Sequence, residues 1–232
     1  MVNPNKQPII LSLELSQRDG TVSMSNRDGA ESTKTVHTGS RGVDTVFPTI
    51  SKIAEELSIN PRSIELVAVS IGPGGFTGLR TSIAIAKMIS FSTGAAVIPI
   101  ETALVTVASS KTDKGFYYVL SGVKHDAFWL SKIRLQTKEQ CCYASISCVA
   151  ELEKSINEAD GVFADSFAPE ALPTLCLNND VPLFNSEPNA QALLRLGGEL
   201  YNSGVSVDPL KVSPLYPREP EAVRMWKELH KK

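Results

Sequence analysis

A glycine-rich turn between a strand pattern and a helix pattern constrains the fold of this chain more than any other feature. Residues 70–81 read SIGPGGFTGLRT and place four glycines within seven positions. The turn follows an apolar run typical of a buried strand (66–71) and precedes a helix pattern (79–91). Because glycine loses the most backbone freedom on folding, such a loop indicates a positive φ or a very close approach to a phosphate or a backbone. A tight turn without any ligand is the open alternative.

Two common nucleotide-binding motifs do not match this loop. A Walker A motif has Lys and then Ser or Thr directly after its last glycine, where this chain has Leu79 and Arg80. A dinucleotide fingerprint, Gly-x-Gly-x-x-Gly, needs a glycine at the position of Thr77. The glycines therefore predict a close approach of the loop to a phosphate or a backbone, but they match no known nucleotide-binding motif of these two kinds.

The loop and the helix pattern after it resemble a known family. The segment GPGGFTGLR (72–80), followed by AIAK (84–87), is similar to the signature of the TsaB (YeaZ-like) proteins, where serine is usual at Gly75. These proteins take part in the threonylcarbamoyladenosine (t6A) modification of tRNA. The similarity covers roughly the first half of the chain. The second half is similar mainly in element order and in Tyr216-Pro217-Arg218, where the family usually has Tyr-Leu-Arg.

Length and charge bound the class of protein. The chain has 232 residues, 42% hydrophobic and 21% charged, which is the composition of a globular protein with a substantial core. A net charge of −2 provides no basic field for nucleic acid, so we expect a partner to make any contact with tRNA. No apolar run approaches the ~20 residues of a membrane span, and residues 1–8 do not read as a signal peptide. We therefore expect a cytoplasmic location.

The cysteines and histidines do not form a metal-binding pattern. They are Cys141, Cys142, Cys148, Cys176, His37, His125 and His230. Neither a C-x-x-C pair nor an H-E-x-x-H motif is present, so we expect free thiols and no metal.

The strand and helix patterns occur twice in the same order. The patterns cover 9–15, 21–25, 32–38, 43–57, 66–71, 79–91 and 96–100, and then 116–121, 127–134, 142–147, 149–157, 161–164, 169–177, 181–184 and 190–201. This order is typical of two ribonuclease-H-like lobes, each a mixed five-stranded sheet flanked by helices. We therefore predict an α/β, actin-like (ASKHA) duplication, the fold that the resemblance also implies. The predicted units are residues 1–108, residues 109–209, and a C-terminal tail (210–232) with a short helix.

An actin-like fold raises the question of a complete ATP site. After the first strand the chain has Glu14, where relatives usually carry Asp, and no glycine or threonine before Gly20. The matching turn of the second half (121–126) has one glycine, and Lys124 stands where relatives have Arg. With phosphate loops missing on both sides, we expect no catalytic residues and no cofactor in the isolated chain.

The remaining candidates for a nucleotide contact are Gly74, Gly75 and Lys87. The resemblance leaves room for ATP or ADP only at the interface of a heterodimer.

The resemblance implies that the glycine loop and the first-half helices dock a partner. Apolar residues lie on two faces of the helix pattern 79–91, which favours packing on its own sheet and on something external. Burial within its own domain is the alternative. The residues expected at the interface are Ile50, Phe76, Thr77, Leu79, Arg80, Ile83, Ile85, Ala86 and Met88.

The sequence and the resemblance together predict a non-catalytic scaffold subunit of the t6A machinery. It would dimerise with a catalytic TsaD-type subunit, with a TsaE-type ATPase as a further partner, and form a homodimer when alone. It would contact tRNA only through the complex and bind no membrane. The open alternatives are a divergent actin-fold ATP-dependent phosphotransferase, a peptidase and a loose Rossmann reductase.

Overall fold

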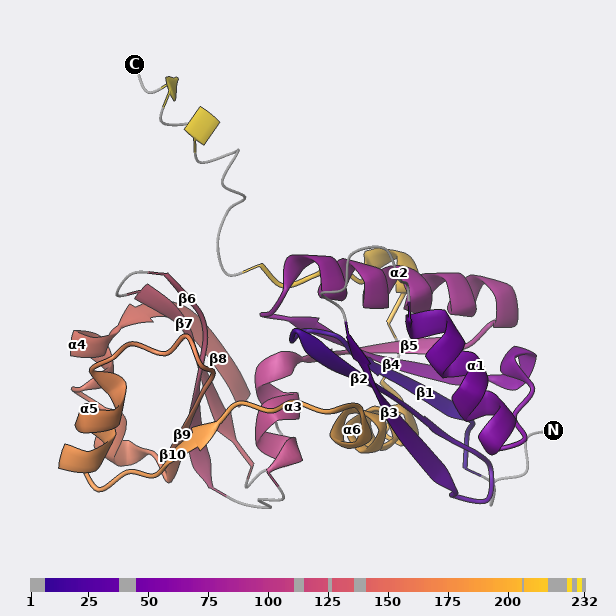
Figure 1. Ribbon diagram of the computed structural model, residues 1–232, viewed down its shortest axis with the longest axis horizontal. Coiled ribbons are helices and arrows are strands. Elements are labelled where there is room, and N and C mark those ends of the chain that lie inside the picture. Colours follow the sequence, from indigo (N-terminus) through magenta and orange to yellow (C-terminus); the bar gives the residue numbers. More distant parts are fainter. Residues whose placement is uncertain are drawn as a thin grey trace.

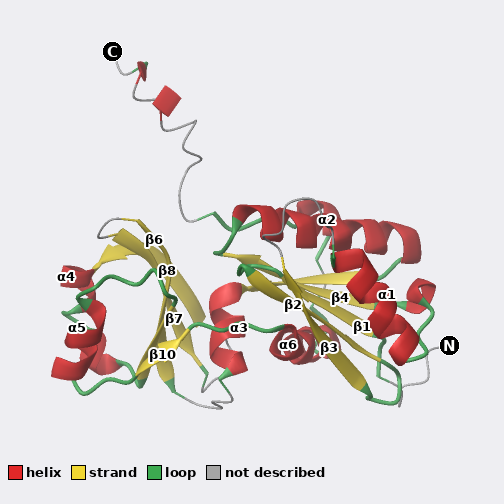
Figure 2. Ribbon diagram, viewed as in Figure 1, coloured by secondary structure: helices red, strands yellow, loops and turns green. Residues whose placement is uncertain are grey.

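The computed structural model has two lobes that lie side by side, with helices α3 (Thr102–Ser109) and α6 (Ala190–Asn202) between their sheets (Figure 1). The structure describes residues 7–37, 45–110, 115–124, 127–135, 141–205, 207–216, 225–226 and 229–230. Each lobe begins with three consecutive strands, after which helices alternate with two further strands, as the sequence patterns predict (Figure 2).

The first lobe contains a five-stranded sheet with the order β3-β2-β1-β4-β5. Its elements are β1 (Ile10–Glu14), β2 (Asp19–Ser25), β3 (Glu31–His37), α1 (Val46–Glu56), η1 (Pro61–Ser63), β4 (Leu66–Gly72), α2 (Phe76–Thr93) and β5 (Ala96–Glu101). Strand β2 is antiparallel to β1 and β3, whereas β4 is parallel to β1 and β5.

The second lobe repeats this topology. Its elements are β6 (Phe116–Lys124), β7 (Ala127–Arg134), β8 (Cys141–Cys148), α4 (Val149–Leu152), η2 (Ile156–Glu158), β9 (Gly161–Ala164), α5 (Leu172–Asn178) and β10 (Leu183–Asn185). The sheet order β10-β9-β6-β7-β8 and the strand directions match those of the first lobe, with β6 in the place of β1. The predicted duplication of a mixed five-stranded sheet flanked by helices is therefore confirmed.

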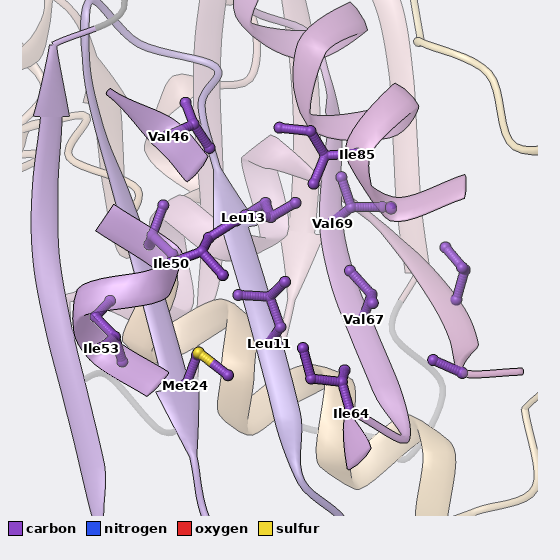
Figure 3. Packing of buried hydrophobic residues seen from close by; sticks show 14 of the residues in the cluster. Leu11, Leu13, Met24, Val46, Ile50, Ile53, Ile64, Val67, Val69 and Ile85 are labelled. Atoms are coloured by element: carbon purple, nitrogen blue, oxygen red, sulfur yellow. The ribbon is translucent and has the colours of Figure 1, made fainter. Parts of the chain in front are cut away.

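The first sheet is covered on both faces. Helices α1 and α2 pack on one face, and α3 and α6 pack on the other (Figures 1 and 2). Strand β1 therefore buries alternate side chains on opposite sides: Leu11 and Leu13 face α1 and α2, whereas Ile10 belongs to the cluster around α3 and α6. Figure 3 shows the first of these clusters, into which Leu11 and Leu13 point.

The hairpin between β2 and β3 forms where the sequence predicts it. Gly29 has a φ of +82°, a conformation that suits glycine, and the Asn26 side chain accepts hydrogen bonds from the backbone N–H groups of Asp28 and Ala30. The Asp28-Gly29 signal is therefore confirmed by local turn chemistry.

Helix α3 was not predicted from the sequence. Every residue from Thr102 to Ala108 is buried, because the helix packs between the two sheets. A helix that is enclosed on all sides has no polar face, so its sequence lacks the apolar periodicity that identifies a surface helix. The predicted helix over 149–157 is also shorter than expected, since α4 ends at Leu152 and a separate 3-10 turn, η2, follows.

The unit boundaries predicted from chain order need correction. Helix α6, placed by chain order in the second lobe, packs on β1 and β4 of the first sheet. The segment 207–216 returns to the first lobe as well: Val207 bridges to Val97 of β5, and Val212 is buried in the cluster under α1 and α2. Residues 210–216 thus belong to the body of the first lobe and are not part of a separate tail. Of the predicted tail helix, the described residues are exposed, and the rest lies outside the described part; the described residues are Met225, Trp226, Leu229 and His230.

Candidate functional site

The glycine loop packs against the turn that follows β1. The backbone N–H of Gly75 donates a 2.7 Å hydrogen bond to the carbonyl oxygen of Ser16. A Cβ atom at Gly74 would lie 2.7 Å from that same oxygen, and one at Gly78 would overlap the carbonyl oxygen of Leu15. The glycines are therefore required for close approach between two backbone segments of this chain.

Gly72, at the start of the loop, packs against the C-terminal segment. Its φ is +110°, and a Cβ atom there would lie 2.8 Å from the carbonyl oxygen of Leu215. The N–H of Leu215 in turn donates a 2.7 Å hydrogen bond to the carbonyl oxygen of Ile71. The loop is thus held between the turn after β1 and a segment that lies more than 130 residues further along the chain.

The three candidates for a nucleotide contact all have partners inside the lobe. Gly74 and Gly75 pack on Ser16, and Lys87 Nζ donates a 3.2 Å hydrogen bond to the carbonyl oxygen of Leu210. The two glycines therefore lie directly against the backbone of the turn after β1.

Glu14, at the end of β1, is a buried carboxyl group. Its Oε1 atom accepts a 2.9 Å hydrogen bond from the backbone N–H of Ser16. Burial raises the pKa of Glu14 above its ordinary value, and the nearby Ser16 and Ser70 lower the pKa by a smaller amount. Among the described residues, Glu14 Oε2 and the hydroxyls of Ser16 and Ser70 lack a hydrogen-bond partner.

Five residues expected at a partner interface are buried in the first lobe. They are Ile50, Leu79, Ile83, Ile85 and Ala86, with exposed fractions of 0–6%. In Figure 3, Ile50 and Ile85 point into the cluster beneath α1 and α2. The second apolar face of α2 is covered because η1 and η3 (Pro209–Lys211) pack against this helix. The assignment of these five side chains to a partner surface is therefore corrected: they form part of the lobe's own core.

A stripe of exposed residues runs along the outer side of α2. It comprises Thr77, Ala84, Met88 and Phe91, which recur at helical spacing and share one face. The exposed fraction is 56% for Met88 and 97% for Phe91. We call these four residues the α2 stripe. The sequence prediction included Thr77 and Met88 but missed Phe91, although its position three residues after Met88 places it on the same face.

An aromatic cluster with one arginine lies at the N-terminal end of α2. The rings of Phe76 and Tyr216 are stacked with their centroids 5.3 Å apart. The Arg80 guanidinium lies over the Phe76 ring, 3.7 Å from its centroid, and Arg80 Nε donates a 2.9 Å hydrogen bond to the Tyr216 hydroxyl. Phe76 and Arg80 were expected at a surface, and both are exposed. Tyr216 comes from the segment after Leu215, and nothing in its local sequence indicates this contact.

Metal and catalytic patterns do not emerge among the described residues. Within them, no group of three or more His, Cys, Asp and Glu side chains is arranged to hold a metal ion. His37 lies at the surface, where Nδ1 is 2.7 Å from Asp19 Oδ1. Cys148 and Cys176 are free thiols, and burial raises the pKa of Cys176. His125 and the side chains of Lys124, Cys141 and Cys142 lie outside the described part.

A groove of about 660 Å³ lies along α6, on the opposite side of the first sheet from α2. Its wall includes Gln191, Arg195 and Glu199. Arg195 Nη2 donates a 3.2 Å hydrogen bond to the carbonyl oxygen of Ala108, which ties α6 to the end of α3. The mixed charges of this groove do not form a nucleophile–base pair.

Residues 40–181 match the family model of TsaD, tRNA N6-adenosine threonylcarbamoyltransferase, over more than half of the chain. The chain belongs to the TsaD family. Two solved structures from Pseudomonas aeruginosa have the same fold. The first, an uncharacterized protein with similarity to peptidase YEAZ, has a TM-score of 0.73 at 18% identity over 91% of this chain and 100% of that chain. The second, YeaZ, has a TM-score of 0.68 at 16% identity over 90% of this chain and 99% of that chain.

These matches confirm two predictions from the sequence. The resemblance of the glycine loop to the TsaB (YeaZ-like) proteins holds at the level of family and fold. The two-lobed actin-like architecture holds as well, since each lobe of this TsaD-family chain has the same sheet order. Among the described residues, no helix is both long enough and apolar enough to cross a membrane.

Proposed function

We propose that this TsaD-family chain is a non-catalytic scaffold subunit of the t6A machinery, which pairs with a catalytic TsaD-type subunit. The observation that supports the proposal is the α2 stripe, in which Met88 and Phe91 are largely exposed. Burying a side chain of this size stabilises a complex by about 1.5–3 kcal/mol, so two of them supply a substantial part of a binding free energy.

The choice of partner follows from the family match. Residues 40–181, which include α2, match the TsaD family model, so we expect a TsaD-type subunit to contain a helix equivalent to α2. Equivalent surfaces can pair around an approximate two-fold axis, so that the α2 helix of one subunit lies against the α2 helix of the other. Ala84, at the centre of the stripe, allows the two helices to approach closely, and Met88 adapts to an imperfect match.

Pairing of two copies of this chain through the same stripe follows from the same geometry. We therefore propose a homodimer in the absence of the TsaD-type subunit and a heterodimer in its presence. The heterodimer is favoured wherever the partner surface complements the stripe better than a second copy does. A TsaE-type ATPase joins the complex in this proposal, tRNA is contacted through the complex alone, and the setting is the cytoplasm.

The proposal that this chain performs no catalysis rests on the residues around the first turn. The glycine loop is filled by backbone from Leu15 and Ser16, and Glu14 is a buried carboxyl group whose charged form is disfavoured. These features oppose the phosphotransferase alternative, which needs backbone N–H groups free to hold phosphates. We propose that any ATP or ADP is bound at the interface with the catalytic subunit and not by this chain alone.

The decisive experiment measures mass in solution by size-exclusion chromatography with light scattering. Three samples are compared: the chain alone, the chain with a purified TsaD-type subunit, and the Met88→Glu/Phe91→Ser double variant of the chain with the same subunit. We expect a heterodimer with the wild type and separate species with the double variant. If wild type and TsaD-type subunit elute separately at concentrations of tens of micromolar, the proposal is wrong. ATP turnover by the pure chain would instead support the phosphotransferase.

A further inference from the structure

The cluster of Phe76, Arg80 and Tyr216 extends the surface formed by the α2 stripe. Arg80 lies three residues after Thr77 and four before Ala84, so it continues the same face of the helix. Unlike the other members of that face it carries a charge, and its guanidinium is fixed by two separate contacts. One is the Phe76 ring at 3.7 Å, and the other is the Tyr216 hydroxyl, to which Nε donates at 2.9 Å.

Within the part of the chain that the structure describes, most of the hydrogen-bonding capacity of Arg80 is unused. A guanidinium has five N–H donors, of which Nε–H is taken by Tyr216. In the part of the chain that the structure describes, no carboxylate lies within ion-pair distance of Arg80. Within those described residues, the four Nη donors of the exposed Arg80 have no hydrogen-bond acceptor.

The position of Tyr216 is fixed by backbone contacts. The Leu215 N–H donates to the Ile71 carbonyl oxygen at 2.7 Å, and Gly72 lacks the side chain that would displace the Leu215 carbonyl. Val212, four residues before Tyr216, is buried in the core of the lobe. The C-terminal segment thus brings a hydroxyl group to Arg80 from 136 residues away in the sequence.

We infer that Arg80 is a polar anchor of the docking surface and binds a carboxylate side chain of the partner subunit, with Tyr216 as its positioning residue. This inference rests on the proposed function. A planar guanidinium matches a carboxylate through two parallel hydrogen bonds. Because Arg80 is already held in one orientation, binding costs less side-chain entropy than it would for a mobile arginine. Arginine and tyrosine at the edge of an apolar stripe are also the residue types that dominate interface hot spots.

Three substitutions test the inference by measuring the dissociation constant of the complex with the TsaD-type subunit. Arg80→Ala is expected to weaken binding by about tenfold or more, and Arg80→Lys by nearly as much, because lysine keeps the charge but loses the planar fork. Tyr216→Phe keeps the stacked ring and removes only the hydroxyl. We expect it to weaken binding by about threefold, since Arg80 then samples several orientations.

The matched control is Arg134→Ala in the second lobe. Arg134 is also exposed and lies over an aromatic ring, 5.0 Å from the centroid of Phe116, but it is on β7 and distant in the fold from α2. Its removal should leave the dissociation constant unchanged. The wild-type constant should also rise with ionic strength, and this dependence should be weaker in Arg80→Ala, as expected when one ion pair is lost.

The outcomes separate this inference from the proposed function. Suppose that the wild type binds, that Met88→Glu weakens binding, and that neither Arg80→Ala nor Arg80→Lys changes the dissociation constant. This result overturns the role of Arg80 and leaves the proposed function intact. Absence of wild-type binding overturns both. Thermal unfolding of each variant shows whether the fold is retained, and Arg80→Lys decides the question if Arg80→Ala unfolds.

Discussion

The carbonyl oxygen of Ser16 accepts a 2.7 Å hydrogen bond from the backbone N–H of Gly75, which joins the turn after β1 to the glycine loop. These two segments contact one another directly, and Gly74 and Gly78 have no room for a side chain because of that contact. The loop that most resembles a ligand site is therefore a packing contact between two backbone segments of the lobe, and this contact sets the position of α2.

The glycines of this loop should differ in their tolerance of substitution. Gly78→Ala is expected to lower the free energy of unfolding by about 1–3 kcal/mol, because the new Cβ atom would overlap the Leu15 carbonyl oxygen. Gly75→Ser is the matched control. A Cβ there would meet Ser16 O at 3.4 Å, and Gly75 is the N-cap of α2 with an extended φ of −62° and ψ of 122°. Serine should therefore stabilise by a few tenths of a kcal/mol, roughly. Urea denaturation measures both, and equal effects would contradict the packing argument.

Substitutions at buried and at exposed positions of α2 should differ in their effect on the free energy of unfolding. Ile85→Glu is expected to lower the free energy of unfolding by more than about 3 kcal/mol, because it places a carboxylate in the cluster beneath α1 and α2. Met88→Glu should change it by less than about 0.5 kcal/mol, since the side chain is 56% exposed. Thermal unfolding of the isolated chain measures the loss of stability in Ile85→Glu. Light scattering measures the loss of pairing in Met88→Glu. A folded, unpaired Ile85→Glu variant would show that Ile85 belongs to the interface after all.

The raised pKa of Glu14 predicts a specific dependence of stability on pH. Its pKa is above the ordinary value of 4.5 because burial disfavours the carboxylate. The folded state therefore holds the proton more tightly than the unfolded state, and this contribution to stability is complete below the unfolded pKa and is lost as the pH rises through the folded pKa.

Glu14→Gln, which is neutral at every pH, removes this dependence. We expect the stability of the variant relative to wild type to increase as the pH rises above about 4.5. Urea denaturation from pH 4 to 8 measures the difference. A constant difference between the two proteins across that range would exclude a raised pKa at Glu14.

The first lobe should not fold from its own consecutive residues. Helix α6 covers the face of the sheet that carries Ile10, Leu66 and Ala68, so a fragment of residues 1–110 leaves that face exposed. We expect this fragment to be unfolded or aggregated, and to fold when residues 187–216 are joined to it by a flexible linker. The chemical-shift dispersion of proton NMR spectra shows whether each of the two fragments is folded. A well-dispersed spectrum for the short fragment would restore the unit boundary that chain order suggests.

The sequence alone determined the features whose causes are local. The Asp28-Gly29 turn, the strand patterns and the amphipathic face of α1 each depend on neighbouring residues, and their repeated order predicted the duplicated sheet. The glycine loop was recognisable because its close approach requires several glycines within a short stretch. These signals located the turn before α2 and the start of that helix.

Only the tertiary structure decided which side of α2 is free. The sequence shows two apolar faces on this helix, and nothing in its period indicates that the segment around Val212 covers one of them. The same is true of Tyr216, which reaches Arg80 across 136 residues, and of α3, whose apolar character is the result of enclosure by both sheets. Periodicity reports how a segment alternates between buried and exposed, but burial itself depends on which distant segment arrives at each face.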